Sequence, residues 1–102
     1  MKGSYQRKAD AIIALQERGY HYDFILKEEN IHCLQQGRLI CPDDFEVIEA
    51  YRFDGKRRMC DNHVIYAIRL SNNDIRGILM TPYSLLAKGL SIHLWSKLGT
   101  CL

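Results

Sequence analysis

Two strand-like runs joined by a short polar turn constrain this chain more than any other feature. Residues 63–71 and 75–81 are short runs rich in apolar side chains and bounded by turn-forming or polar residues, which is typical of strands. The linking segment contains two asparagines, which tolerate the positive φ angles of a tight hairpin turn. A third run of this kind covers residues 46–54. Together the three runs predict an antiparallel sheet from Glu46 to Thr81.

The residues before this sheet predict one helix and further strands. Between residues 5 and 18, apolar side chains recur at helical spacing, with Ser4 suited to the N-cap and Gly19 to the end. This amphipathic helix is expected to cover the sheet. Shorter runs that favour strands lie at residues 20–27, 31–34 and 39–41.

Two signals after the sheet predict short C-terminal helices. Thr81-Pro82 resembles an N-cap followed by proline at the first helical position, and Ser91 could cap a last helix. The expected fold class is therefore α+β: an antiparallel sheet of four to five strands, an N-terminal helix on one face and short C-terminal helices. With 102 residues and no repeat or linker, residues 1–102 are expected to form a single domain.

Composition excludes several classes of protein. The net charge of +2 is too close to balance to predict a nucleic-acid-binding protein. The sequence shows no signal peptide, and no apolar run approaches the roughly 18 residues that cross a bilayer. A cytoplasmic protein without membrane contact is expected, in which the four scattered cysteines would stay thiols.

Four segments carry a resemblance to a known family, and they cover residues 19–24, 44–55, 64–68 and 77–79. Together they resemble a family of short uncharacterised bacterial proteins of about this length, many of which carry the label "phosphoribosylpyrophosphate synthetase". The similarity covers most of the chain, and residues 44–55 are its most specific part. The resemblance implies a shared fold and bacterial origin, assigns no catalytic residues, and through the label suggests a phosphoribosyl-type ligand.

The expected strand register places one carboxylate on the face that should meet the helix. If Asp54 lies near His63, then Glu49 faces Ile68, beside an open space at Gly77. Desolvation there would raise the pKa of the carboxyl group, which would suit a general acid or base. Alternatively, Glu49 pairs with a tyrosine hydroxyl or with a Lys or Arg. The same face is expected to carry Val47, Tyr51, Phe53, Val64, Tyr66, Leu70, Ile75 and Leu79.

Two arginines are expected to face each other on the opposite side of the sheet. The hairpin register sets Arg69 directly across from Arg76, where like charges repel unless an anion or a carboxylate lies between them. Glu46, on a diagonal from Arg69, could supply that carboxylate in an exposed cluster. In the alternative, the two guanidinium groups hold a small anion or phosphoester.

Cys60 and His63 have the spacing of half a metal site. Zinc would need two more ligands, and His32, Cys33 or Cys41 could contribute only if the fold brings them close. The sequence contains no second close pair with clean metal-ligand spacing, so neither a metal nor another cofactor is expected.

The leading functional prediction is a small binding or interaction module without catalytic activity, able to form a homodimer through an open sheet edge. The alternative is an enzyme or sensor of a phosphorylated metabolite, with Arg69 and Arg76 binding the anion and Glu49 as the base. The expected register puts these groups on opposite faces, which favours the binding module. The short length and the missing phosphate-binding loops also argue against a synthetase-type activity.

Overall fold

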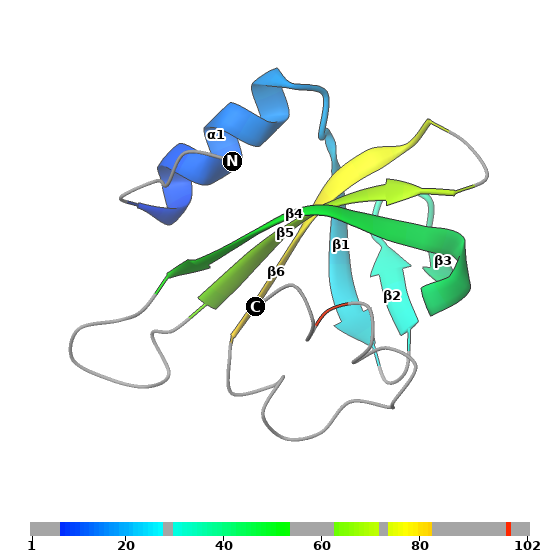
Figure 1. Cartoon of the computed structure of the whole chain (residues 1–102). Helices are drawn as coiled ribbons and strands as arrows, with labels where there is room; N and C mark the ends of the chain where they lie inside the picture. Colours follow the sequence, from blue (N-terminus) through cyan, green and yellow to red (C-terminus); the bar gives the residue numbers. More distant parts are fainter. Residues whose placement is uncertain (1–6, 28–29, 54–62, 72–73, 83–97, 99–102) are drawn as a thin grey trace.

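The computed structural model describes residues 7–27, 30–53, 63–71, 74–82 and 98. The protein has an α+β fold, as predicted, with an N-terminal helix and a mixed sheet of six strands (Figure 1). The helix α1 spans Lys8–Glu17, and a 3-10 turn, η1, spans Pro42–Asp44. The strands are β1 (Tyr22–Lys27), β2 (Asn30–Cys33), β3 (Arg38–Ile40), β4 (Phe45–Phe53), β5 (His63–Leu70) and β6 (Arg76–Pro82).

The sheet consists of two antiparallel three-strand units joined along one parallel seam. Its strand order is β3-β2-β1-β6-β5-β4, and β1 runs parallel to β6, with Tyr22 opposite Gly77 and Phe24 opposite Leu79. The predicted antiparallel sheet of four to five strands is therefore wrong in strand number and at this seam. Alternation identifies a strand but not the direction of its neighbours. The predicted C-terminal helices lie outside the described residues.

A short link forces the sheet to curl. The strands β3 and β4 stand at opposite ends of the strand order, yet only four residues, 41–44, connect them. Six strands laid flat would separate the outer two by about 24 Å. The five Cα steps from Ile40 to Phe45 reach at most about 18 Å, and less through a helical turn. The sheet must therefore bend, as Figure 1 shows.

The curled sheet encloses, on what we call its inner face, the larger of the two hydrophobic clusters formed by the described residues. Every strand contributes to this cluster, including both outer ones through Ile40 and Phe45. Leu98, from the C-terminal part of the chain, is buried in it, and its carbonyl oxygen accepts a hydrogen bond of 3.0 Å from the Tyr66 hydroxyl. The other members are Phe24, Ile31, Cys33, Val64, Ile68, Leu70 and Leu79.

The helix lies on the other side of the sheet, which we call the helix-side face. Its buried residues Ala11 and Leu15 form a smaller cluster with Ile65, Ala67 and Ile78, among others. The prediction that α1 meets the face of Val64 and Tyr66 is wrong. All residues from Val64 to Ile68 are buried, so alternation in β5 does not distinguish its two faces.

Both ends of α1 can be compared with the predicted caps. The helix begins at Lys8, and the predicted N-cap Ser4 lies outside the described residues. The predicted end at Gly19 is confirmed, with a φ of 102°. The amide of Gly19 donates to the carbonyl oxygen of Gln16, and the amide of Tyr20 donates to that of Leu15, each at 3.1 Å. This hydrogen-bond pattern is a Schellman motif, and it turns the chain back towards the sheet.

The predicted register is confirmed for one hairpin and wrong for the other. Between β5 and β6, Ile68 lies opposite Gly77 and Arg69 opposite Arg76, as expected. Between β4 and β5, Phe53 rather than Asp54 lies opposite His63, and the register shifts again between Val47 and Glu49. The second shift is a β-bulge at residue 48, which the sequence pattern did not reveal. A bulge adds one residue to one strand and so inverts which face the following side chains occupy.

Gly77 makes room for the seam rather than for a ligand. A Cβ atom at this position would lie 2.5 Å from Cε2 of Phe24 and closer still to the carbonyl oxygen of Tyr22. The prediction of open space beside Gly77 is therefore wrong. The glycine permits the close approach of β1 that the parallel pairing requires.

Candidate functional site

A β4–β5 register one residue away from the predicted one brings Glu49 onto the face of the sheet that carries Arg69 and Arg76. Glu49 of β4 lies opposite Ala67 of β5. Two residues further along β5, Arg69 lies opposite Glu46 of β4 on one side and opposite Arg76 of β6 on the other. Because residues two apart on a strand share a face, Glu49 and the two arginines all lie on the helix-side face. The predicted separation of these groups onto opposite faces is thus wrong.

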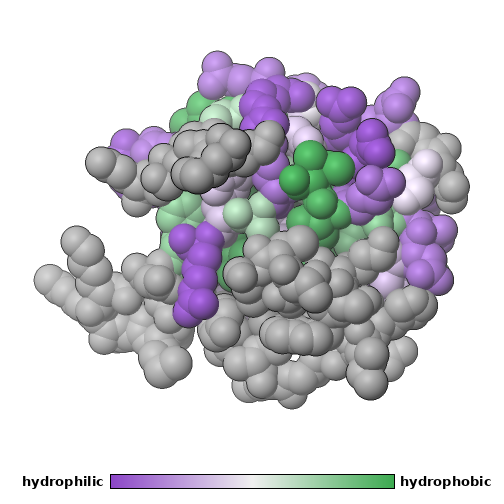
Figure 2. All heavy atoms as spheres, viewed as in Figure 1, coloured by the Kyte–Doolittle hydropathy of each residue, from purple (hydrophilic) through white to green (hydrophobic). Residues whose placement is uncertain are grey.

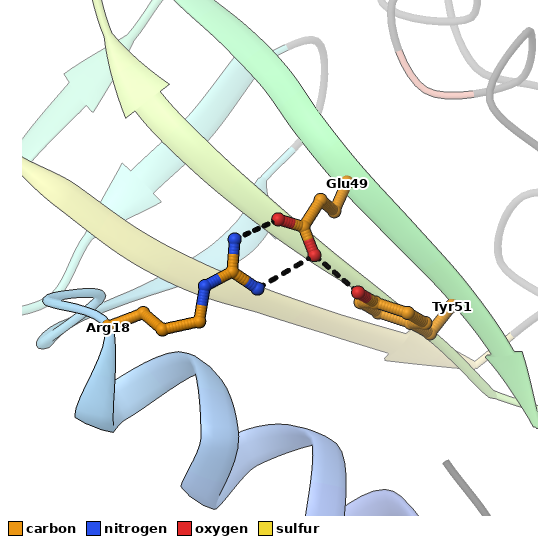
Figure 3. Close-up of polar contacts among 3 residues, drawn as sticks. All are labelled: Arg18, Glu49 and Tyr51. Carbon is orange, nitrogen blue, oxygen red and sulfur yellow. Dashed lines mark hydrogen bonds and ion pairs between the residues drawn. The ribbon is translucent and has the colours of Figure 1, made fainter. Parts of the chain in front are cut away.

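Glu49 is the buried acid of this face, and its carboxylate is held by two other side chains (Figure 3). Nη1 of Arg18 donates to Oε1 of Glu49 at 3.0 Å, and Nη2 of Arg18 forms an ion pair with Oε2. The hydroxyl of Tyr51 also donates to Oε1. The predicted alternative was a tyrosine hydroxyl or a Lys or Arg as the partner of Glu49, and both kinds of partner are present. The carboxylate oxygens are occupied as acceptors, which does not favour a free general base.

Arg18 reaches Glu49 because of how α1 ends. Arg18 is the C-cap residue, directly before the positive-φ Gly19, so the helix terminus lies next to the sheet. The hydrogen bond to Glu49, assisted by the charge of that carboxylate, raises the pKa of the Arg18 guanidinium above its ordinary value, although burial opposes the shift. Arg18 therefore remains charged, and it connects the helix end to β4.

The two facing arginines have different neighbours. Nη2 of Arg69 donates to Oε2 of Glu46 at 3.2 Å, so the predicted Glu46–Arg69 pair is present, directly across the strands rather than on a diagonal. The guanidinium carbon of Arg76 lies 6.0 Å from the centre of the Tyr20 ring, and that of Arg18 lies 5.8 Å from it. One buried aromatic ring therefore contacts two guanidinium groups, an arrangement that cation–π attraction stabilises.

A second feature of the helix-side face is an open pocket of about 240 Å³ beside α1. Six of its lining residues are apolar, and the exception is Asp23, whose carboxylate accepts a hydrogen bond of 2.8 Å from Gln35. The lining residues are Ile12 from the helix, Asp23, Phe24 and Ile25 from β1, Leu34, and Ile78 and Met80 from β6.

Large apolar side chains around this pocket remain exposed. Ile25, Leu34 and Met80 are each more than 40% exposed, as is Leu39 on β3. In the pairing register Ile25 lies opposite His32, and His32 lies opposite Leu39, so these three side chains share one face of the sheet. The exposed apolar side chains therefore continue from the pocket across β1, β2 and β3, which α1 does not cover. On the side seen in Figure 2, hydrophobic side chains likewise reach the surface between hydrophilic ones.

The metal candidates are not brought together by the part of the chain that the structure describes. Cys60 lies outside the described residues, and Nδ1 of His63 lies 3.3 Å from Nζ of Lys8. Cys33 is buried in the inner cluster, whereas Cys41 is exposed. Within residues 7–27, 30–53, 63–71, 74–82 and 98, no group of three or more His, Cys, Asp or Glu side chains could hold a metal ion.

Sequence reasoning missed Arg18 and Tyr20. Both flank Gly19, which was correctly predicted to end the helix, so the signal was available. A residue at a helix C-cap and the one after the glycine are fixed in direction by the Schellman motif and commonly pack back on the structure. What the sequence could not supply was the strand that they would meet.

Comparisons with known proteins found no matching family model, no matching curated protein and no matching solved structure. The resemblance to the family labelled "phosphoribosylpyrophosphate synthetase" therefore stays a prediction. Of the helical residues that the structure describes, none belongs to a helix long and apolar enough to cross a membrane.

Proposed function

We propose that this protein is a small non-catalytic binding module, and that its pocket beside α1 receives one large apolar side chain of a partner protein. The observation that carries this proposal is the pocket itself, which is lined by six apolar residues and one acid. Its volume of about 240 Å³ is below the roughly 300–1,000 Å³ of sites that enclose a drug-sized ligand. Such a pocket suits a single anchoring side chain, the usual centre of a protein–protein contact.

The surroundings of the pocket support a protein partner. A ten-residue helix is about 15 Å long and about 10 Å wide, so α1 can cover about two strands of the sheet. It packs over β5 and β6, and no other element among the described residues forms a second layer on the helix-side surface of β1, β2 and β3. Exposed Ile25, Leu34 and Leu39 lie there, and a partner that anchors in the pocket would cover them.

The state of Glu49 supports the non-catalytic part of the proposal. Its carboxylate is bound by Arg18 and Tyr51, and only 1% of its side chain is exposed. A general base must come within hydrogen-bond distance of the proton that it removes. Here Arg18 and Tyr51 occupy the positions around the carboxylate that a substrate would need. Glu49 acts in this proposal as the group that anchors the end of α1. A cytoplasmic location and membership of the resembled family belong to the same proposal.

The pocket can be tested with indole as a stand-in for an anchoring aromatic side chain. In an NMR titration, indole should shift the amide signals of Ile25 and Ile78 in a saturable way. Met80→Lys, which places a charge on the pocket wall, should weaken this binding at least tenfold. Ile48→Lys is the matched control, because Ile48 is 40% exposed and Met80 44%, but Ile48 does not line the pocket.

Two results would contradict the proposal. One is the absence of saturable shifts at the pocket. The other is equal weakening by Met80→Lys and by Ile48→Lys, which would mean that indole binds to exposed apolar side chains in general. Sedimentation of both variants over a range of concentrations would show, in addition, whether a second copy of the chain supplies the anchoring side chain.

A further inference from the structure

The helix-side face carries three arginines and two glutamates close to the end of α1. Glu49 pairs with Arg18, and Glu46 pairs with Arg69. Arg76 differs from the other two, because its contact within the described part of the chain is the Tyr20 ring and not a carboxylate. The two ion pairs therefore leave one positive charge at this corner without a counter-charge among these five side chains.

Arg69 and Arg76 are held next to each other by the sheet. They are direct partners in the β5–β6 register, where opposing Cβ atoms lie about 4.5–5.5 Å apart, and like charges at that separation repel. Each guanidinium carries five N–H donors, and the contact of Arg69 with Glu46 uses one of its terminal nitrogens. Both arginines thus keep donors that an added acceptor could use.

We propose that this corner binds the phosphoryl group of a small phosphorylated molecule between Arg69 and Arg76. A phosphoryl dianion would replace the repulsion between the two charges with attraction to both. Its oxygens match the planar donor fork of a guanidinium, which binds phosphate in a bidentate manner. The Tyr20 ring, which already holds Arg76, limits the entropy that Arg76 would lose on binding. Arg18 takes no direct part, since Glu49 occupies it.

Acidic residues at the same end restrict the size of the ligand. Asp74 is exposed two residues before Arg76, and the carbonyl oxygen of Asp44 accepts a hydrogen bond of 2.8 Å from the amide of Ser71, so η1 lies beside the β5–β6 turn. A long polyanion would run past these carboxylates and be repelled. A single phosphate monoester needs only the two arginines. This proposal does not depend on the apolar pocket and can fail or succeed separately from it.

The test is an NMR titration of the full chain with inorganic phosphate and with methyl phosphate, monitored at the arginine Nε–Hε signals. Sodium chloride at equal ionic strength controls for screening. We expect saturable shifts at Arg69 and Arg76 with both phosphates, and at least tenfold weaker binding in Arg69→Gln and in Arg76→Gln. Arg76→Lys should fall between, because an ammonium keeps the charge but not the fork.

Arg7→Gln is the matched control, because Arg7 is exposed at the opposite end of α1 from Arg18 and is paired with Asp10. This variant should bind phosphate as the unmodified protein does. The proposal is overturned if the shifts do not saturate and equal those produced by chloride, or if Arg7→Gln weakens them as much as Arg76→Gln. Since all three arginines are exposed or half-exposed, amide spectra of the variants should retain the dispersion of the folded protein.

Discussion

Water reaches Arg18 and Glu49 to very different extents, although the two form one ion pair. The side chain of Arg18 is 43% exposed and that of Glu49 is 1% exposed. If Glu49 loses its charge, Arg18 can turn to solvent. If Arg18 is removed, a buried carboxylate loses its positive partner and cannot be hydrated in exchange. The pair is therefore unequal in its effect on stability.

We expect Arg18→Met to destabilise the protein more than Glu49→Gln does. The first substitution should lower the free energy of unfolding by about 2–3 kcal/mol and the second by about 1 kcal/mol, because only the first leaves a desolvated charge behind. Urea denaturation of both variants measures the difference. Arg7→Met, which breaks an exposed pair with Asp10, should change stability by less than about 0.5 kcal/mol. Equal losses for Arg18→Met and Glu49→Gln would refute this asymmetry.

Among the described glycines, Gly77 is the one at which an added methyl group meets close neighbours. Gly77→Ala places a methyl group against the Tyr22 carbonyl and the Phe24 ring, so we expect a loss of about 2–3 kcal/mol in the free energy of unfolding. Gly37→Ala is the control, because Gly37 has a φ of 62° but nothing within 4 Å of the added carbon. Gly37→Ala should lower the free energy of unfolding by about 1 kcal/mol, which is the penalty for a non-glycine residue in this left-handed backbone conformation. Thermal unfolding of the two variants compares crowding with backbone strain, and a larger loss for Gly37→Ala would rule out this role for Gly77.

At the scale of elements, local sequence patterns were sufficient to locate the strands but insufficient to predict how the strands pair. Strand-like runs and the turn residues between them located each described strand to within two residues, since these signals depend only on neighbours along the chain. The β5–β6 register followed from the short turn, which fixes pairing in a hairpin. The β4–β5 register did not follow, because the connection is longer and a bulge leaves no mark in the sequence of β4. The facing arginines could therefore be predicted, whereas the position of Glu49 on the same face could not.

The bulge at residue 48 allows a test of register by deletion. Val47 and Glu49 lie opposite the adjacent residues Ile68 and Ala67, so deleting Ile48 would leave a regular ladder on both sides. We expect this deletion to change stability by about 1 kcal/mol or less and to preserve the Arg18–Glu49 pair. Deleting Ala50 instead would turn Tyr51 to the wrong face and should cost several times more. Amide spectra and urea denaturation would measure both effects, and similar losses for the two deletions would show that residue 48 is not an added residue.

For the whole molecule, the inner cluster joins the sheet to the C-terminal part of the chain at Leu98. The Tyr66 hydroxyl donates to the Leu98 carbonyl oxygen within this cluster, where neither group has access to water. We expect Tyr66→Phe to lower the free energy of unfolding by about 1–2 kcal/mol, since it leaves a buried carbonyl without this donor. Faster amide exchange at Leu98 would accompany the loss. Tyr22→Phe, at a partly buried ring on the same face, is the control, and an equal loss there would contradict a specific role for Tyr66.

The seam between β1 and β6 has a consequence for how the molecule folds. The units β1–β2–β3 and β4–β5–β6 each contain only pairings between strands that follow one another in the chain, so each can form early. The seam instead joins residues more than fifty positions apart, such as Tyr22 and Gly77. Closing that long loop is the entropically costly event, and it should determine the folding rate. Substitutions at the seam should therefore slow folding, and so should substitutions within either hairpin unit, whose pairings already exist when the seam closes.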